Sequence, residues 1–196
     1  ISSTHVTGYV SPKLKGLDLL IRADSTNLGF LQPFIEGIFS EINGRVNGNV
    51  RLYGDFKHLD LEGEVRAKMD AKIDVLNTYF QIRDDSIHIS SGSLDFRNVK
   101  VYDREGHDGL VNGYLHHTKL KNLMYHFNIR GNNLLMYNTY EAGNMPFYGK
   151  VYGTGNVVLD GGNNAMTVDA SLTTGSNTSF TYITGVTTEA ASNQFI

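Results

Sequence analysis

The amino-acid sequence predicts an all-β protein: a long curved antiparallel sheet folded on itself, with an apolar interior and one short helix. Three observations lead to this fold class. Apolar and polar residues alternate with period two over most of the chain, Gly- and Asn-containing segments separate the alternating stretches, and helical spacing occurs once. Because successive side chains of a strand point to opposite faces, the alternation gives the sheet one dry and one wet face.

The clearest alternation runs from Asn49 to Val75, where polar and largely charged residues occupy every second position. The intervening dry positions are Val50, Leu52, Gly54, Phe56, Leu59, Leu61, Gly63, Val65, Ala67, Met69, Ala71, Ile73 and Val75. Glycines on this face leave it thin and allow the sheet to bend sharply. Few helical segments remain to cover such a face, so the cover must be sheet: a sandwich, a closed barrel, or one sheet curled on itself.

Shorter alternating segments continue to residue 172, with turns predicted at 103–108, 130–133 and 160–164 from their Gly and Asn content. Their dry residues include Phe96, Leu115, Phe127, Val157, Leu159, Met166 and Val168. Leu115 is expected opposite Tyr125 in a hairpin. That register places His116 and His126 together on the wet face.

One stretch, 28–42, has apolar residues three and four positions apart, which is helical spacing. Pro33 suits the first turn of a helix, and Asn27 or Ser25 is a suitable N-cap. We expect one short helix over about 28–40. Its residues Leu31, Ile35 and Ile38 are predicted to cover one end of the apolar interior.

The chain contains an internal echo. Gly48–Gly54 has the sequence GNVRLYG and Gly155–Gly161 has GNVVLDG, and apolar residues follow at equal offsets in both segments. The echo predicts two hairpins of one design, as in proteins whose repeated units add at an open sheet edge.

Composition narrows the function classes. The 196 residues carry a net charge of −3 and no long basic block, which disfavours nucleic acid as a partner. There is no cysteine, no apolar segment long enough for a membrane-spanning helix and no signal peptide. We interpret positions 1–196 as a single segment of a longer repetitive β domain, with any export signal or anchor outside it.

No residue pattern predicts catalysis. Asp70 and Asp74 alternate with lysines as on a solvated strand face, and no nucleophile, phosphate-binding or dinucleotide motif is present. His116 and His126 are too few for a structural zinc site without cysteine. We therefore expect a protein that is not an enzyme and that uses no cofactor and no metal.

If the sheet curls but stays partly open, its dry face forms an apolar groove; an ordinary β-sandwich core is the alternative. The groove-lining residues are expected to be Val50, Leu52, Phe56, Leu59, Leu61, Val65, Met69, Phe96, Leu115, Phe127, Val157, Leu159, Met166 and Val168, with no charge directed inward.

The chain resembles the C-terminal domain of the TamB family (translocation and assembly module, AsmA-like superfamily) over positions 14–182. The resemblance lies in the run GRVNGNVRLYGDFKHLDLEGEVRA from Gly44, in the strand leading to the acidic turn VYDREGHDGLVNG, and in Asn133–Thr181. In the last segment a Leu-rich strand, an Asn-containing loop, FYG and a Gly-interrupted strand follow one another.

The resemblance implies a β-taco fold in a periplasmic protein of the Gram-negative envelope, tethered to the inner membrane by an anchor outside this segment. It implies a role in outer-membrane biogenesis: outer-membrane protein assembly and secretion with a TamA-type barrel, phospholipid transport, or both. A surface adhesin or carbohydrate-binding β module is the alternative. Tyr53, Tyr114, Tyr148 and Tyr152 lie at wet positions, where their rings could stack on sugars.

Overall fold

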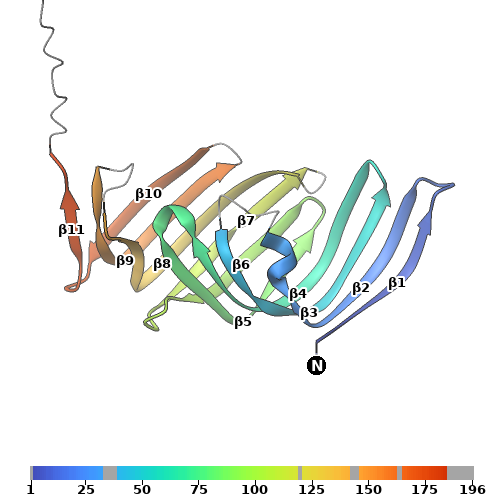
Figure 1. The fold of residues 1–196 in the computed structure, drawn as a ribbon, viewed down its shortest axis with the longest axis horizontal. Coiled ribbons are helices and arrows are strands. Elements are labelled where there is room, and N and C mark those ends of the chain that lie inside the picture. The colour runs from blue at the N-terminus through green and yellow to red at the C-terminus, as the bar shows by residue number, and fades with distance from the viewer. Residues whose placement is uncertain (1, 33–38, 119–120, 142–145, 163–164, 185–196) are drawn as a thin grey trace, which may run out of the picture.

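A computed structural model describes residues 2–32, 39–118, 121–141, 146–162 and 165–184, and nearly all of them lie in strands (Figure 1). The strands are β1 (Ser3–Ser11), β2 (Gly16–Asn27), β3 (Phe39–Asp55), β4 (His58–Ile73), β5 (Thr78–Ser90), β6 (Ser93–Tyr102), β7 (Asp108–Thr118), β8 (Lys121–Thr139), β9 (Phe147–Gly162), β10 (Ala165–Thr174) and β11 (Ser179–Tyr182). The prediction of an all-β fold is confirmed.

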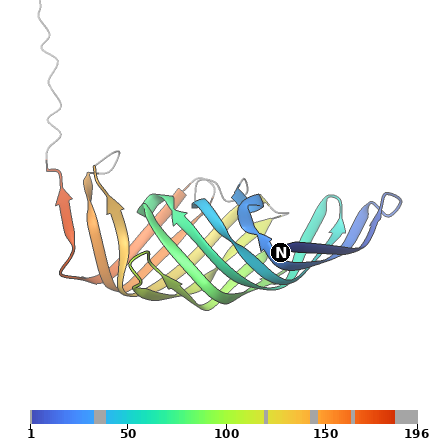
Figure 2. The ribbon, with the colours of Figure 1, turned by 60° about the horizontal axis from the view of Figure 1, so that its bottom comes forward.

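The strands form one antiparallel sheet in which β1 to β10 follow their order along the chain. The short β11 pairs with β9 beside the end of β10. Among the described residues β1 and β10 do not pair with each other, so the sheet is open. It curves across its width into a trough (Figure 2), as the sequence predicts.

The helical segment is shorter in its described part than predicted. A 3-10 helix, η1, spans Leu28–Leu31, and the Asn27 side chain caps it by accepting a hydrogen bond from Gly29 N at 2.7 Å. Residues 33–38 lie outside the described part, and β3 begins at Phe39. A second 3-10 helix, η2 (Asp74–Leu76), was not predicted from the sequence.

The sheet contains a structural repeat. We call β1–β4 the first unit and β7–β10 the second unit, and the β5–β6 hairpin joins them. The row Gly8, Leu19, Leu52 and Leu61 corresponds to the row Gly113, Phe127, Leu159 and Val168. The rows on either side correspond in the same way, so four consecutive strands share one register. The predicted echo covers the third and fourth strands of each unit.

The repeat extends to an irregularity that bends the sheet. The second strand of each unit has a bulge, and one bulge residue takes a left-handed conformation: Ser25 (φ 52°) or Asn133 (φ 53°). The N–H of that residue donates to a side chain of the next strand. Ser25 N donates to Asn47 Oδ1 at 2.8 Å, and Asn133 N donates to Thr154 Oγ1 at 2.9 Å. A bulge adds local twist and bends its strand, so each unit carries its own curvature.

The β6–β7 hairpin has the same bulge. Asn98 is left-handed (φ 53°) and its N–H donates to Asn112 Oδ1 at 2.9 Å. The residue after each acceptor side chain is a glycine: Gly48, Gly113 or Gly155. A Cβ on Gly113 would lie 2.0 Å from His126 O, so the close approach of neighbouring backbones requires glycine there.

Candidate functional site: the apolar face of the trough

One row of cross-strand partners crosses all ten consecutive strands on the inner face of the trough. It consists of Val6, Ile21, Val50, Gly63, Ile89, Leu94, Leu115, Tyr125, Gly161 and Met166. None of these side chains is charged, and the only polar side-chain atom is the Tyr125 hydroxyl. The predicted pairing of Leu115 with Tyr125 is confirmed.

The adjacent row, on the outer face, has the opposite chemistry. It consists of His5, Arg22, Asn49, Glu64, His88, Asp95, Tyr114, His126, Asp160 and Thr167. Every member is polar. Period-two alternation is therefore in phase in these two rows across all ten strands, and the inner row contains no charge.

The predicted groove residues differ in burial. Val65, Phe127, Val157 and Leu159 are buried, while Val50, Leu52, Leu59, Leu61, Met69, Phe96, Leu115 and Met166 are half-buried. Val168, on edge strand β10, is 47 % exposed. Burial therefore does not follow the strand order, because the predicted residues of β9 are buried while those of the central strands β6 and β7 are half-buried.

One residue of the predicted lining is wrong. Phe56 lies in the β3–β4 turn, where its N–H donates to Lys15 O at 2.7 Å, and its side chain is 48 % exposed. Alternation fails here because the strand ends at Asp55. The side chains of Leu31, Ile35 and Ile38, predicted to cover the interior, lie outside the described part of the chain.

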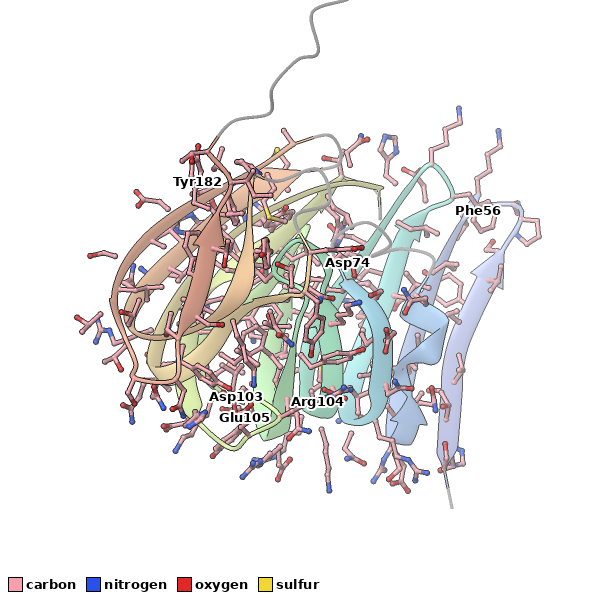
Figure 3. The ribbon with its side chains drawn as sticks, turned by 60° about the vertical axis from the view of Figure 1, so that its left-hand side comes forward. Phe56, Asp74, Asp103, Arg104, Glu105 and Tyr182 are labelled. Atoms are coloured by element: carbon pink, nitrogen blue, oxygen red, sulfur yellow. The ribbon has the colours of Figure 1, made fainter. Side chains whose placement is uncertain are left out.

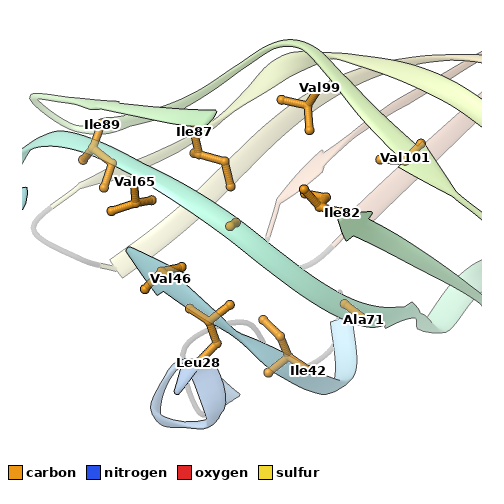
Figure 4. Close-up of a cluster of buried hydrophobic side chains, with 11 residues drawn as sticks. Leu28, Ile42, Val46, Val65, Ala71, Ile82, Ile87, Ile89, Val99 and Val101 are labelled. Carbon is orange, nitrogen blue, oxygen red and sulfur yellow. The ribbon is translucent and has the colours of Figure 1, made fainter. Parts of the chain in front are cut away.

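The buried part of the face consists of two clusters. The first contains Leu28, Ile42, Val46, Val65, Ala67, Ala71, Ile82, Ile87, Ile89, Val99 and Val101 (Figure 4). Leu28, in the 3-10 helix, is 5 % exposed and packs there against β3. The second cluster includes Phe80 of β5 with Phe127 of β8 and Leu159 of β9. Strands from both halves of the sheet thus pack against each other across the trough.

One carboxylate takes an inner position, although no inward charge was expected. Asp85 takes the register position opposite Ala67, where β5 is bulged. It is half-buried, and its oxygens accept hydrogen bonds from Ser86 N at 2.8 Å and Lys100 N at 2.9 Å. The carboxylate replaces ladder bonds that the bulge interrupts between β5 and β6. It is satisfied by backbone and is not available to a ligand.

The loop 103–107, predicted as part of a turn, connects β6 and β7 at the lower edge of the sheet in Figure 3. The Asp103 carboxylate is buried, and it accepts backbone N–H bonds from Glu105, His107 and Leu135 of β8, each at 2.9 Å. His107 Nδ1 lies 2.8 Å from the same carboxylate. Burial alone would raise the pKa of Asp103, but these hydrogen bonds outweigh it and hold the pKa below its ordinary value.

The same loop reaches the neighbouring strands on both sides. Glu105 accepts from Lys150 Nζ at 2.8 Å and from the Tyr152 hydroxyl at 2.7 Å, both on β9. The Arg104 guanidinium stacks 3.2 Å from the Tyr79 ring centroid and pairs with Asp70 on β4. The loop therefore connects β4 and β5 with β8 and β9, and it buries Tyr152 to 3 % exposure.

The outer histidines lie where the sequence predicts. The Tyr114 ring stacks on His116 at 4.1 Å and on His126 at 5.7 Å, and His126 Nδ1 lies 2.6 Å from Asp160 Oδ1. Within the described ranges no group of three His, Asp or Glu side chains has the geometry to hold a metal ion.

A shallow polar hollow of about 670 Å³ also lies over β7–β10. Its side chains include Leu110, Asn128, Arg130, Asn156 and Ser171. None of the described residues that line it is aromatic.

Sequence reasoning missed the contribution of the first two strands and the full extent of the repeat. Val6, Val10, Leu19 and Ile21 all face inward. The signal was present, because 6–10 (VTGYV) and 111–115 (VNGYL) occupy equivalent positions in β1 and β7. Ile89, Leu94 and Tyr125 also belong to the inner row and were not predicted to line it.

Comparison with known proteins gives no family: no protein-family description, curated protein or solved structure matches this chain. Across the described helices, none has both the length and the apolar character needed to cross a membrane. The class defined by the fold and the site is an open, curved, all-β trough with an apolar inner face.

Proposed function

We propose that this chain is a non-catalytic segment of an envelope-biogenesis protein, and that its trough binds apolar chains and conducts them along the inner face. The observation that carries the proposal is the inner row, in which ten consecutive strands contribute apolar residues or glycine and no charge.

The dimensions of the row suit an acyl chain. Neighbouring strands lie about 4.8 Å apart, so a row across ten strands extends roughly 40 Å. One leaflet of a bilayer core is about 15 Å thick, so an acyl chain fits within this length. Each methylene moved from water to an apolar surface gains about 0.8 kcal/mol, so binding needs no polar contact.

The resemblance to the TamB family supports the biological setting. We place the protein in the Gram-negative periplasm, tethered to the inner membrane by a segment outside this one. The trough would then carry phospholipid toward the outer membrane or hold unfolded outer-membrane protein strands, with a TamA-type barrel as the partner.

The alternative, an adhesin or carbohydrate-binding module, is less well supported. Its four candidate tyrosines do not form a platform: Tyr152 is buried, Tyr53 lies beneath Arg51 at 4.8 Å, and Tyr114 stacks on histidines. They come from β3, β7 and β9 and do not converge on the polar hollow.

Photo-crosslinking in cells tests the proposal. A photoreactive residue is placed at Leu61 or Met166, both half-buried on the inner face, in the full-length protein. The matched controls are their outer neighbours Asp60 and Thr167. We expect lipid adducts from the inner positions at several times the yield from the outer ones, because the inner row is apolar and the outer row is polar.

Three results discriminate further. Polypeptide adducts confined to the inner positions would assign the trough to protein cargo. Equal labelling of both faces, or no labelling in a protein that is folded by circular dichroism, would contradict a conduit. Specific binding of glycans at the polar hollow would favour the alternative.

A further inference from the structure

The inner row contains one polar side-chain atom, and the repeat isolates it. In the second unit this row runs through Leu115, Tyr125, Gly161 and Met166. In the first unit the same register positions hold Val10, Leu17, Gly54 and Leu59. Leucine therefore serves the shared backbone design at the place of Tyr125. What the tyrosine adds is a larger ring and one hydroxyl.

The Tyr125 hydroxyl has no hydrogen-bond partner among the described residues. Tyr125 is 4 % exposed, and burial alone raises the pKa of its hydroxyl. The other buried tyrosine in the described ranges, Tyr152, donates its hydroxyl proton to Glu105 at 2.7 Å. Buried tyrosine hydroxyls usually find such a partner, because an unpaired polar group in apolar surroundings costs free energy. Since its pKa is raised, the Tyr125 hydroxyl keeps its proton and is available as a donor.

The hydroxyl lies over Gly161, near the ends of two strands. A Cβ added to Gly161 would be 2.5 Å from the hydroxyl and 2.6 Å from Ala165 O, so the glycine leaves the space that the phenol occupies. β9 ends one residue later, at Gly162, and β10 begins at the exposed Ala165. The unpaired donor is therefore close to accessible chain at the end of the strands.

The surroundings of the hydroxyl define the chemical class of its partner. Leu115 and Met166 lie in the same row on either side of Tyr125 and Gly161, and both are half-buried. A ligand at this place needs methylenes for these side chains and one oxygen that accepts a hydrogen bond. An acyl chain has both, because it ends in a carbonyl or carboxylate oxygen.

We propose that the Tyr125 hydroxyl donates a hydrogen bond to the carbonyl or carboxylate oxygen of an acyl chain bound in the trough. This inference rests on the proposed function, in which the inner face binds apolar chains. Apolar sites commonly use a few polar groups to fix the orientation of a ligand. A single donor in an otherwise apolar row fixes where the oxygen end of the chain lies. It also favours acyl chains over apolar molecules that have no oxygen.

The test compares two probes on the complete 196-residue chain and on Tyr125→Phe. Palmitate has a carboxylate, whereas the fluorescent dye N-phenyl-1-naphthylamine is apolar and has no oxygen. Calorimetry measures palmitate binding, and fluorescence measures dye binding. Tyr125→Phe should weaken palmitate binding about tenfold, because one hydrogen bond to a charged acceptor is lost. Dye binding should be unchanged, because the ring remains.

Tyr114→Phe is the matched control. It removes a hydroxyl from the outer row of the neighbouring strand β7, where Tyr114 is 37 % exposed, and it should leave the binding of both probes unchanged. Circular dichroism melts check that both variants fold. Methyl palmitate keeps the carbonyl and lacks the charge, so it separates the two sources of the oxygen. Weakening of palmitate and its ester alike assigns the site to esterified lipid as well as free fatty acid, and weakening of palmitate alone assigns it to the free carboxylate.

The outcomes separate this inference from the function on which it rests. Equal palmitate affinities of Tyr125→Phe and the unmodified protein, with dye binding retained, would overturn the role of the hydroxyl and leave the apolar trough intact. Parallel loss of palmitate and dye binding in a folded Tyr125→Phe would overturn it too, since ring packing would then be the cause. If the unmodified protein bound neither probe, the proposed function would fail, and this inference with it.

Discussion

The two units of the sheet share a hydrogen-bonding register and differ in what surrounds them. Val50 in the first unit is half-buried, whereas its equivalent Val157 in the second is 3 % exposed; Leu19 is half-buried and its equivalent Phe127 is 7 % exposed. Backbone design is the same in both. Burial is therefore decided by neighbours: the second unit packs against Phe80 of β5 and Leu76 of η2, whereas β1 forms an exposed edge.

The comparison separates two properties of a repeated sheet. Register and curvature are local, since each unit has its own bulge and its own side chain that accepts from the bulge. Stability depends on position, since β1 of the first unit is an edge strand, whereas its equivalent β7 lies between β6 and β8. Substitutions at equivalent positions should therefore lower the free energy of unfolding by different amounts where the two positions differ in burial. They should lower it by equal amounts where they affect only the bulge.

The largest expected difference concerns Gly113 and Gly8. A Cβ on either would lie 2.0 Å from a carbonyl oxygen of the next strand, and both have positive φ. Gly113→Ala should destabilise the protein by more than about 3 kcal/mol, because β7 is held between β6 and β8. Gly8→Ala should cost about 1 kcal/mol or less, since the edge strand β1 can separate locally. Urea denaturation measures both values.

Gly106→Ala is the control for this pair. Gly106 has φ +95°, but a Cβ added to it would have no described atom within 4 Å, so this variant reports backbone strain without a close approach. Equal losses from Gly8→Ala and Gly113→Ala would contradict the positional argument.

The second prediction tests the loop that distinguishes the second unit. Asp103→Asn should destabilise the protein by roughly 3 kcal/mol at pH 7, because hydrogen bonds that the two oxygens of a buried carboxylate accept are lost or weakened. The pKa of Asp103 lies below its ordinary value. Its contribution is therefore present above the unfolded pKa near about 3.9 and disappears as the pH falls through the folded pKa.

Stability measured at pH 7, 5 and 3 should consequently fall less steeply in Asp103→Asn than in the unmodified protein. Asp55→Asn is the control, since hydrogen bonding by Lys57 N also lowers the pKa of Asp55 but its side chain is exposed. Parallel pH profiles for Asp103→Asn and the unmodified protein would exclude Asp103 as the source of acid sensitivity.

The smallest expected effects are those of the acceptors at the bulges. Asn47→Ala and Thr154→Ala each remove one acceptor for the N–H of a left-handed residue, and each should cost about 1 kcal/mol. Similar values would support a shared local design. A large loss in one unit only would mean that these side chains have further, unequal roles. Asn49→Ala, on the exposed face of the same strand, should be close to neutral.

Much of this architecture was predictable because alternation is a local property of the chain. The inner positions of β3, β4 and β9 follow directly from period two. The prediction failed at Phe56 because a turn interrupts the strand without changing the apolar pattern. In β5 the inward residues change from odd positions at Ile87 to even positions at Ile82, because the bulge adds one residue.

The candidate site was only partly predictable. Whether Val157 is buried or Val168 exposed depends on which strands lie beside them, and an alternating pattern contains no information about its neighbours. The hydrogen bond from Leu135 N to the Asp103 carboxylate joins positions 32 residues apart, so no local sequence pattern predicts it.

The bulges whose left-handed residue donates its N–H to a side chain of the next strand have a geometric consequence for the trough. They lie in the strand pairs β2–β3, β6–β7 and β8–β9, and each bends the sheet by its own residues. The width of the trough is then a property of the single strand pair, while its length is a property of how many strand pairs are joined. Duplication of such pairs lengthens the trough and leaves its width unchanged.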